Sequence, residues 1–413
     1  MSKFKILKML KKVLISKPFI MFVCLGIVYL LLSLGVGLTE GNSILDLIEF
    51  NIVISVGLTT VVAVIVNQFA QFLNRYLEEG LKLNEDYVAL MKRYHKESFL
   101  EGKIITCRGH QKSVTNTKMP IIELYHKPPK ISLVLNAKPF VLDDFLVNQS
   151  EKMIKAHETS RIANKDIFRL NHVDEKDGAL TFNISFASFY HTLITNRAMD
   201  VEITKKMTLR EYYEYGPKLS SLKTSKMANG LGIASMLVTT DGYYLFIYRG
   251  MNNPTGKHQV SVCNSTLNYH LTQKQVDLKD RETDIVMTEK ESEQFLFESI
   301  YNGLNQKLKY PQEGPFAASF SDFVPIGLVR NIKEGGKPEL YYLVKSKMSK
   351  DELSEHVLQM KKDMTKGDTN HLVFFRKEDI KAIDYHTMKI HNKHYKLHYN
   401  ALYFAQMVLL DQL

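Results

Sequence analysis

The sequence LGIASMLVTTDGYYLFIYRG (Leu231–Gly250) places two apolar runs on either side of a short polar segment. The first run, Leu231–Val238, is almost continuously apolar, which is typical of a strand buried on both faces. Thr240-Asp241-Gly242 has the composition of a tight hairpin turn. Tyr243–Arg249 then alternates like a returning strand, so the sequence predicts a β-hairpin here.

The segments that follow this hairpin predict a helix and a second pair of strands. Thr288 and Glu291 have the spacing of a capping box, so we expect a helix to begin there. Two β-type runs, Phe323–Val329 and Leu340–Val344, flank a glycine-rich turn. An amphipathic pattern over Tyr399–Leu413 predicts a final helix.

Upstream of the hairpin, residues 101–217 contain short apolar runs separated by turn signals, which predicts a β-rich extension. These runs are Ile121–Tyr125, Ile131–Leu135, Ile167–Val173 and Leu180–Phe186. In residues 71–100 the apolar positions are three or four apart, so we expect a helical connector before the extension.

Composition excludes several classes of protein. The chain has 413 residues, of which 24% are charged and 45% hydrophobic, unlike a disordered or collagen-like chain. Its three cysteines form no CxxC pair, which excludes a disulfide framework and a cysteine-rich zinc module. The net charge is +10, but six of these charges are lysines in residues 1–17. The basic character is therefore local, and we expect no nucleic-acid partner.

Two uncharged runs near the N-terminus, Pro18–Leu38 and Phe50–Ala70, are long enough to cross a bilayer as helices. About 20 apolar residues span the hydrocarbon core. The link between the runs contains no Lys or Arg, whereas residues 1–17 form a basic tail. The positive-inside rule then predicts that both termini are cytoplasmic.

The second of these runs carries small and polar residues at multiples of four positions. They are Asn51, Ser55, Thr59 and Asn67. Small and polar ridges let membrane helices pack closely. One interpretation is that hairpins of several subunits associate along this ridge into an oligomer. The other, equally compatible with the pattern, is that the two spans pack against each other within one hairpin.

The hairpin, the following helix and FVPIGLVRNIKEGGKPELYYLVKSKMSKDEL (Phe323–Leu353) together resemble the Nudix fold. The resemblance covers roughly Lys218 to Glu378 and implies an α-β-α sandwich within residues 218–413. The predicted fold class is therefore membrane-anchored. Two N-terminal transmembrane α-helices precede a cytoplasmic α/β Nudix-like domain that has a β-rich N-terminal extension.

The Nudix signature itself departs from the family pattern. In the box G-x5-E-x7-R-E-U-x-E-E-x-G-U, glutamates hold the magnesium ions that activate water. Glu298 falls at the arginine position, and Ser299, Asn302 and Gly303 fall at three glutamate positions. These side chains offer little to a hard cation. We therefore expect a domain that binds a nucleotide without hydrolysing it, with no metal or other cofactor, and not an enzyme.

A non-hydrolytic Nudix-like domain joined to two membrane helices resembles the membrane-anchored effectors of bacterial anti-phage systems that signal through cyclic oligonucleotides. The resemblance implies that a partner nucleotidyltransferase makes a cyclic di- or trinucleotide. It also implies that the effector senses this ligand, oligomerises and disrupts the lipid bilayer. The implied location is the bacterial inner membrane.

Candidate ligand-binding residues follow from what a cyclic nucleotide presents. Phosphates favour Arg and Lys, and bases favour aromatic faces and amide edges. Arg249 ends the predicted hairpin, Arg197 lies in a short polar motif, and two lysines lie in the loop before the hairpin. The full set is Tyr190, Asn196, Arg197, Ser220, Lys223, Lys226, Arg249, Tyr269 and His270.

Three other interpretations stay open. A tethered hydrolase would take metal ligands from the acidic residues Asp277, Asp280, Glu282 and Asp284. A scaffold would bind no small molecule at all. A zinc site would use the histidines near the C-terminus, although that pattern favours a strand and a turn instead. The histidines are His386, His391, His394 and His398.

Overall fold

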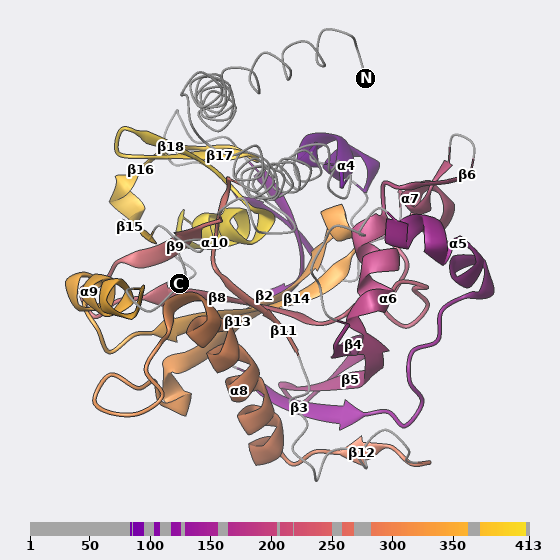
Figure 1. Ribbon diagram of the computed structural model, residues 1–413, viewed down its shortest axis with the longest axis horizontal. Helices are drawn as coiled ribbons and strands as arrows, with labels where there is room; N and C mark the ends of the chain where they lie inside the picture. Colours follow the sequence, from indigo (N-terminus) through magenta and orange to yellow (C-terminus); the bar gives the residue numbers. More distant parts are fainter. Residues whose placement is uncertain are drawn as a thin grey trace, which may run out of the picture. The chain divides into compact units, whose positions relative to one another are not determined.

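A nine-stranded mixed sheet organises the part of the chain that the computed structural model describes (Figure 1). The structure describes residues 83–84, 86–94, 103–107, 117–124, 129–155, 164–204, 207–217, 219–249, 258–267, 282–361 and 372–409. These residues all belong to one compact unit, Glu78–Leu413.

Strands from distant parts of the sequence meet in this sheet. Its strands are β1 (Lys103–Cys107), β2 (Thr117–Leu124), β8 (Gly232–Val238), β9 (Tyr244–Tyr248), β10 (Val260–Ser261), β11 (Cys263–Thr266), β13 (Phe323–Asn331), β14 (Lys337–Lys345) and β15 (Leu372–Phe375). Seven follow the order β1-β2-β13-β14-β8-β9-β10, while β11 pairs with β8 and β15 with β9. The β14–β8 pairing is parallel, and the other pairings are antiparallel.

The elements predicted around the hairpin are confirmed. β8 and β9 pair antiparallel across the turn, with Val238 opposite Tyr244. The expected helix is α8 (Glu289–Leu308), whose capping box is complete: the Thr288 amide donates to Glu291 Oε2 (2.8 Å), and the Glu291 amide donates to Thr288 Oγ1 (3.3 Å). The second strand pair is β13 and β14, and the final helix is α10 (Tyr399–Leu409).

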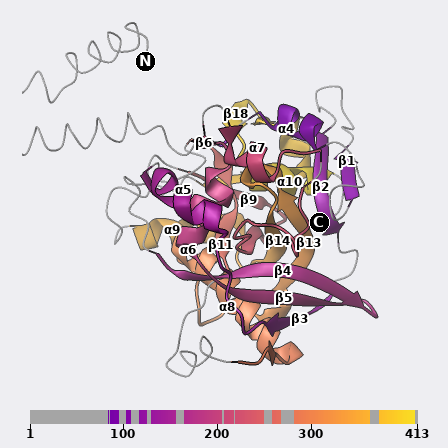
Figure 2. The same cartoon turned by 90° about the vertical axis from the view of Figure 1, so that its right-hand side faces the viewer.

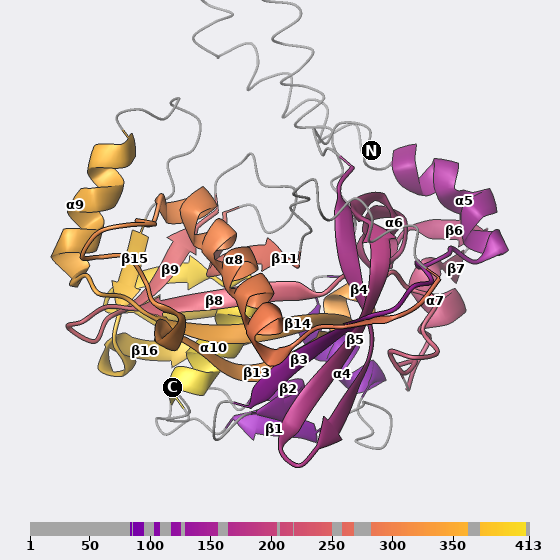
Figure 3. The ribbon, with the colours of Figure 1, turned by 90° about the horizontal axis from the view of Figure 1, so that it is seen from below.

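Each face of the sheet carries its own core, because successive side chains of a strand point to opposite faces. From β14, Tyr341 and Leu343 enter the core that contains α4 (Tyr87–Arg93) and α10. Leu340 and Val344 enter the core that contains α8. Figure 3 shows α8 and α10 on opposite sides of the sheet.

A second, four-stranded sheet has the order β12-β3-β5-β4. Its strands are β12 (Ile285–Val286), β3 (Lys130–Leu135), β5 (Ala179–Ser188) and β4 (Asp166–Lys176). Three of them correspond to apolar runs predicted within residues 101–217, and Figure 2 shows them side by side. Their apolar side chains join the core of α8.

The remaining elements are short. They are the helices α5 (Asp144–Lys155), α6 (Phe189–Ile194), α7 (Leu209–Tyr213) and α9 (Lys350–Lys361), the 3-10 turns η2 (Asn196–Ala198), η4 (Phe320–Asp322), η5 (Ile332–Glu334) and η6 (Lys377–Asp379), the strand pair β6 (Glu202–Thr204) and β7 (Met207–Thr208), and the sheet of β16 (Ile380–Ile383), β17 (Thr387–Ile390) and β18 (Lys393–Lys396). A third small core lies among α5, α6 and α7.

The predicted fold class, a membrane-anchored chain with a Nudix-like α-β-α sandwich, is wrong. The described part of the chain consists of mixed sheets and seven α-helices, none of them long and apolar enough to cross a bilayer. α8 has 20 residues but carries charges along its length, and the more apolar α10 has only 11. A span needs about 20 apolar residues, so neither helix meets the requirement.

The predicted location in a bacterial inner membrane is wrong on the same finding. The runs from which it was inferred, Pro18–Leu38 and Phe50–Ala70, lie outside the described residues. The same holds for Asn51, Ser55, Thr59 and Asn67 of the predicted oligomerisation ridge. Of the predicted connector, 71–100, the structure describes α4 and a few residues beside it.

Candidate functional site

The turn between β13 and β14 has a conformation that depends on its glycines. η5 ends at Gly335, and Gly335 and Gly336 have φ of 62° and 80°, in the left-handed region that favours glycine. A Cβ at Gly335 would also overlap the side chain of Met199. The backbone of the turn therefore keeps one conformation, which fixes the positions of its Cα atoms and the directions of its side chains.

Two buried arginines bind the backbone of this turn. Arg210 donates from Nη1 to the Ile332 carbonyl (2.8 Å) and from Nη2 to the Lys333 carbonyl (2.6 Å). The same guanidinium makes a two-pronged contact with Asp200, at 2.7 and 2.9 Å. Arg330 donates to the Gly336 carbonyl from within β13. Charge-assisted bonds of this kind are stronger than neutral ones, so the turn is firmly anchored.

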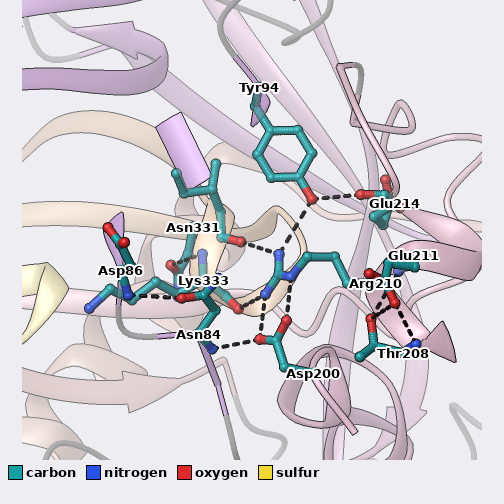
Figure 4. Close-up of polar contacts among 11 residues, drawn as sticks. Asn84, Asp86, Tyr94, Asp200, Thr208, Arg210, Glu211, Glu214, Asn331 and Lys333 are labelled. Atoms are coloured by element: carbon teal, nitrogen blue, oxygen red, sulfur yellow. Dashed lines mark hydrogen bonds and ion pairs between the residues drawn. The ribbon is translucent and has the colours of Figure 1, made fainter. Parts of the chain in front are cut away.

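The Arg210 network also reaches the segment around α4 (Figure 4). Arg210 Nη1 donates to the Tyr94 hydroxyl oxygen (3.4 Å), and this hydroxyl donates to the Glu214 carbonyl (2.6 Å). The Asn84 amide donates to Asp200 Oδ2 (2.6 Å). One guanidinium therefore joins the β13–β14 turn to α4.

On the α10 side of the sheet, charged side chains gather in the interior. Lys337 Nζ contacts Glu339 Oε1 directly and lies 3.6 Å from Glu334 Oε2. Arg197 Nε lies 4.0 Å from Glu334 Oε1, and its guanidinium lies over the Phe189 ring at 5.0 Å. The charges of Arg197 and Glu334 also act on Arg249. The charges of Arg197, Arg249, Lys333 and Lys337 all act on the buried His398. We call these four cations, together with Glu334 and Glu339, the charged cluster.

A glycine in the predicted first strand makes room for this cluster. Gly232 of β8 is the parallel partner of Glu339 in β14. A Cβ at Gly232 would overlap the Glu339 carboxylate, so that carboxylate lies directly against the backbone of β8. The Tyr399 hydroxyl, at the start of α10, donates to Glu339 Oε1 (3.1 Å). A strand that reads as apolar therefore borders a polar site.

The charged cluster contains four cationic side chains and two carboxylates. Burial lowers the pKa of Arg249 to about 10, which leaves it protonated at neutral pH. Burial raises the pKa of Glu339, partly offset by Lys337, and any protonation of Glu339 makes the cluster more positive. Glu334 Oε1 lies 4.0 Å from Arg197 Nε, too far for a hydrogen bond, so an anion would be a better partner for this guanidinium.

Arg197 is the member with unused hydrogen-bonding capacity. Its Nε and Nη1 are buried and make no hydrogen bond, and the same is true of Glu334 Oε2. Buried polar groups normally have partners, so each such atom calls for an explanation. The Arg197 side chain is 17% exposed, against 3% for Glu334 and Glu339, so Arg197 is the more exposed member of its ion pair with Glu334.

The structure brings three of the predicted ligand-binding residues together. Arg197 and Arg249 belong to the charged cluster, and Asn196 donates from Nδ2 to the Glu334 carbonyl (2.8 Å). Arg197 lies within η2, which packs against η5, and Arg249 directly follows β9. That these residues bind a ligand stays a prediction.

The other predicted residues lie elsewhere or are not described. Tyr190 packs against the small core of α5, α6 and α7. Ser220 offers its carbonyl to Arg330 Nη2 (3.1 Å), Lys223 is exposed, and Lys226 pairs with Asp143 at 3.5 Å on the surface. Tyr269 and His270 lie outside the described residues.

Sequence reasoning missed Lys333, Glu334, Lys337 and Glu339, which make up most of the cluster. The available signal was the spacing of Lys337 and Glu339. Residues two apart on a strand share a face. A Lys-x-Glu pair that leads into the apolar run Leu340–Val344 therefore indicates two opposite charges side by side at the end of a buried strand.

The positions aligned with the Nudix glutamates are packing positions in this structure. Ser299 is buried in α8, and a Cβ at Gly303 would lie 3.1 Å from the Ser265 Cβ on β11. Helix and strand approach too closely there for a long acidic side chain to fit without displacement. This explains in physical terms why small residues occupy this face of α8.

The residues of the alternative sites have other roles where they are described. Asp284 accepts from the Ala137 amide (2.8 Å) and Asn136 Nδ2 (3.0 Å), while Asp277 and Asp280 lie outside the described residues. His391 lies in the turn between β17 and β18, and this strand-and-turn prediction is confirmed. Within the described ranges, no three His, Cys, Asp or Glu side chains are placed to hold a metal ion.

Comparison with known proteins adds no family to this picture. No family model matches the sequence, and no curated protein matches it. The resemblance to Nudix-like effectors therefore stays a prediction. Function has to be inferred from the charged cluster itself.

His398 gives the cluster a predicted pH dependence. Burial, together with the charges of the four cations, lowers its pKa well below the usual range. The unfolded chain therefore binds a proton below about pH 6.5 that the folded chain does not, and stability falls as pH falls. Between pH 7 and 5 this contributes a loss of about 2 kcal/mol. In urea unfolding, the free energy of unfolding of His398→Asn should fall by about 2 kcal/mol less than that of the wild type between pH 7 and pH 5.

His394→Asn is the matched control, because His394 is exposed on β18. It should keep the wild-type pH dependence. The raised pKa of Glu339 acts in the opposite direction, since its folded form retains a proton to higher pH. The pH dependence of stability in each variant is therefore compared with that of the wild type, in which Glu339 contributes equally. Identical pH profiles for wild type and His398→Asn would contradict the assignment.

Proposed function

We propose that this protein binds an anionic, phosphate-bearing ligand of the nucleotide class at the charged cluster and does not hydrolyse it. The observation that carries the proposal is the Arg197 guanidinium, whose buried Nε and Nη1 make no hydrogen bond and whose Nε lies 4.0 Å from Glu334 Oε1. An anion that reaches Arg197 would satisfy these donors.

Phosphate is the anion that suits this arrangement. A guanidinium presents a planar fork that binds two phosphate oxygens at once, and Lys337 adds a compact charge nearby. A cyclic dinucleotide presents two phosphodiesters to such groups, and it belongs to the ligand class that the sequence resemblance implies. We therefore take cyclic oligonucleotides as the first candidates.

Binding without hydrolysis fits the chemistry of the described residues. Phosphoanhydride hydrolysis in the Nudix manner needs several carboxylates around magnesium. Glu334 and Glu339 instead face Lys337, which competes with any metal ion for their oxygens. Ser299 and Gly303, the buried residues of α8 at two of the aligned glutamate positions, carry no carboxylate. The cluster is arranged to hold negative charge.

Thermal unfolding of the full chain tests the proposal. We expect pyrophosphate, or a cyclic di- or trinucleotide, to raise the melting temperature by about 5 °C at a hundredfold excess over its dissociation constant. Arg197→Gln should abolish the shift, because it removes the unbonded guanidinium. Lys345→Gln removes an exposed charge from the end of β14 and should leave the shift unchanged.

Two outcomes would contradict the proposal. An equal shift in wild type and Arg197→Gln would place the binding elsewhere, and no shift with any of these probes would exclude a phosphate site. Chromatography of the nucleotide after incubation with the protein and magnesium addresses hydrolysis. Intact ligand is expected, and released mononucleotide would show that the protein is a hydrolase.

A further inference from the structure

The β13–β14 turn faces the charged cluster on one side and α4 on the other. We infer that anion binding at the charged cluster loosens the docking of α4 through this turn. The inference rests on the proposed function and adds a regulated element to it. α4 lies near the start of the compact unit Glu78–Leu413.

The three residues of η5 make both connections. The Glu334 side chain lies between Lys337 and Arg197 in the cluster. The carbonyls of Ile332 and Lys333 accept from Arg210, which also contacts Tyr94 at the end of α4. A displacement of Glu334 therefore moves the backbone of η5, and η5 is connected to α4 through Arg210 and Tyr94.

A second connection runs through α10. The Tyr87 hydroxyl of α4 and the Tyr403 hydroxyl of α10 are 2.6 Å apart and buried. Tyr399, one helical turn earlier in α10, donates to Glu339 of the cluster (3.1 Å). Both routes join α4 to the carboxylates of the cluster.

Competition between the bound anion and Glu334 for the same cations drives the displacement of the Glu334 side chain. Glu334 has Lys337 and Arg197 as counter-charges at 3.6 and 4.0 Å, without a hydrogen bond to either. An incoming phosphate takes over these cations and brings a second negative charge beside a carboxylate that is 3% exposed. A buried charge without a partner is strongly unfavourable. The Glu334 side chain must then leave, and η5 moves with it.

Coupling of this kind is reciprocal, so weaker docking of α4 must tighten anion binding by the same factor. Tyr94→Phe removes the hydroxyl that bonds the Glu214 carbonyl and Arg210. Tyr94 is not a member of the charged cluster. We expect Tyr94→Phe to bind pyrophosphate about fivefold more tightly than the wild type in calorimetric titration of the full chain.

Tyr301→Phe is a matched control. The Tyr301 hydroxyl on α8 donates to the Tyr310 carbonyl at 2.6 Å, the same kind of buried bond at the same length. It belongs to the other core, so the affinity for pyrophosphate should not change. An equal gain in both variants would show a general effect of lost stability and would overturn the inference.

Hydrogen exchange of the wild type gives a second readout that does not depend on a variant. The amides of Leu90 and Tyr94 donate within the α4 region and report its docking. We expect saturating pyrophosphate to speed their exchange about tenfold. If pyrophosphate binds while this exchange stays unchanged, the coupling is wrong and the proposed function stands. If pyrophosphate does not bind at all, both are wrong.

Discussion

Lys337→Met is expected to lower the free energy of unfolding by about 3–5 kcal/mol, the usual cost of removing one partner of a buried ion pair. Lys337 contacts Glu339 and lies near Glu334, and all three side chains are at most 8% exposed. Methionine preserves the length and apolar packing of the lysine stem but removes the direct ion-pair partner of Glu339 and leaves Glu334 with Arg197 alone. Urea unfolding monitored by circular dichroism measures the loss.

Lys345→Met tests whether the loss comes from the buried charge and not from lysine replacement in β14. Lys345 ends the same strand and is exposed, so its replacement should change stability by no more than about 0.5 kcal/mol. The double variant Lys337→Met with Glu339→Leu removes both members of the closest pair. It should recover a large part of the stability, since apolar residues often replace buried ion pairs without loss. Equal losses for Lys337→Met and Lys345→Met would contradict the description of the cluster.

Arg210→Leu is expected to cost a similar amount, about 3–5 kcal/mol, because a fully buried guanidinium has several partners that would be left behind. Asp200 would lose both prongs of its contact, and the carbonyls of Ile332 and Lys333 would lose their donors. Arg210→Lys should recover only part of the loss, because an ammonium cannot reproduce the planar fork. Guanidinium chloride unfolding of both variants gives the comparison.

Arg376→Leu is the control for Arg210→Leu. Arg376 donates to the Asp241 carbonyl at the surface (2.8 Å) and lies 4.1 Å from the Tyr243 ring centroid. Exposed contacts of this type contribute about 0.5–1 kcal/mol. A loss at Arg210 no larger than that at Arg376 would mean that Arg210 does not anchor the β13–β14 turn.

Local elements of the fold could be predicted because their signals lie within a few residues. The turn at Thr240–Gly242 determines the pairing of β8 with β9, and the Thr288–Glu291 box determines where α8 begins. Each depends on bonds between near neighbours. The approximate bounds of these elements therefore followed from the sequence alone.

The sheet as a whole could not be predicted in the same way. β14 lies parallel to β8 although about a hundred residues separate them, and β2 from the predicted extension pairs with β13. Such pairings depend on which apolar faces meet in the folded chain. A similar order of strands and helices suggested a Nudix-like sandwich, but element order does not fix strand neighbours. The fold-class prediction failed because the described part of the chain consists of mixed sheets and seven α-helices, none long and apolar enough to cross a bilayer.

The candidate site was predicted in part. Arg197 and Arg249 were identified as phosphate-binding residue types, but nothing in the sequence shows that they share a cluster. Their proximity depends on where the β13–β14 turn lies, and on the arginines that hold its backbone. From the sequence alone, Lys337 was interpreted as the end of a turn, and Glu339 as a residue just before a strand. Gly232 gave no local sign that a carboxylate would lie against it.

Calorimetric titration of the full chain with pyrophosphate, in wild type and in the double variant Arg197→Gln with Arg249→Gln, tests the central claim most directly. We predict a single class of site in the wild type and an affinity at least about a hundredfold lower in the double variant, because two charged contacts are lost. The double variant should still unfold cooperatively, because Lys337 remains as the counter-charge of Glu334 and Glu339. Equal affinities in the two proteins, or no binding to the wild type, would contradict the account.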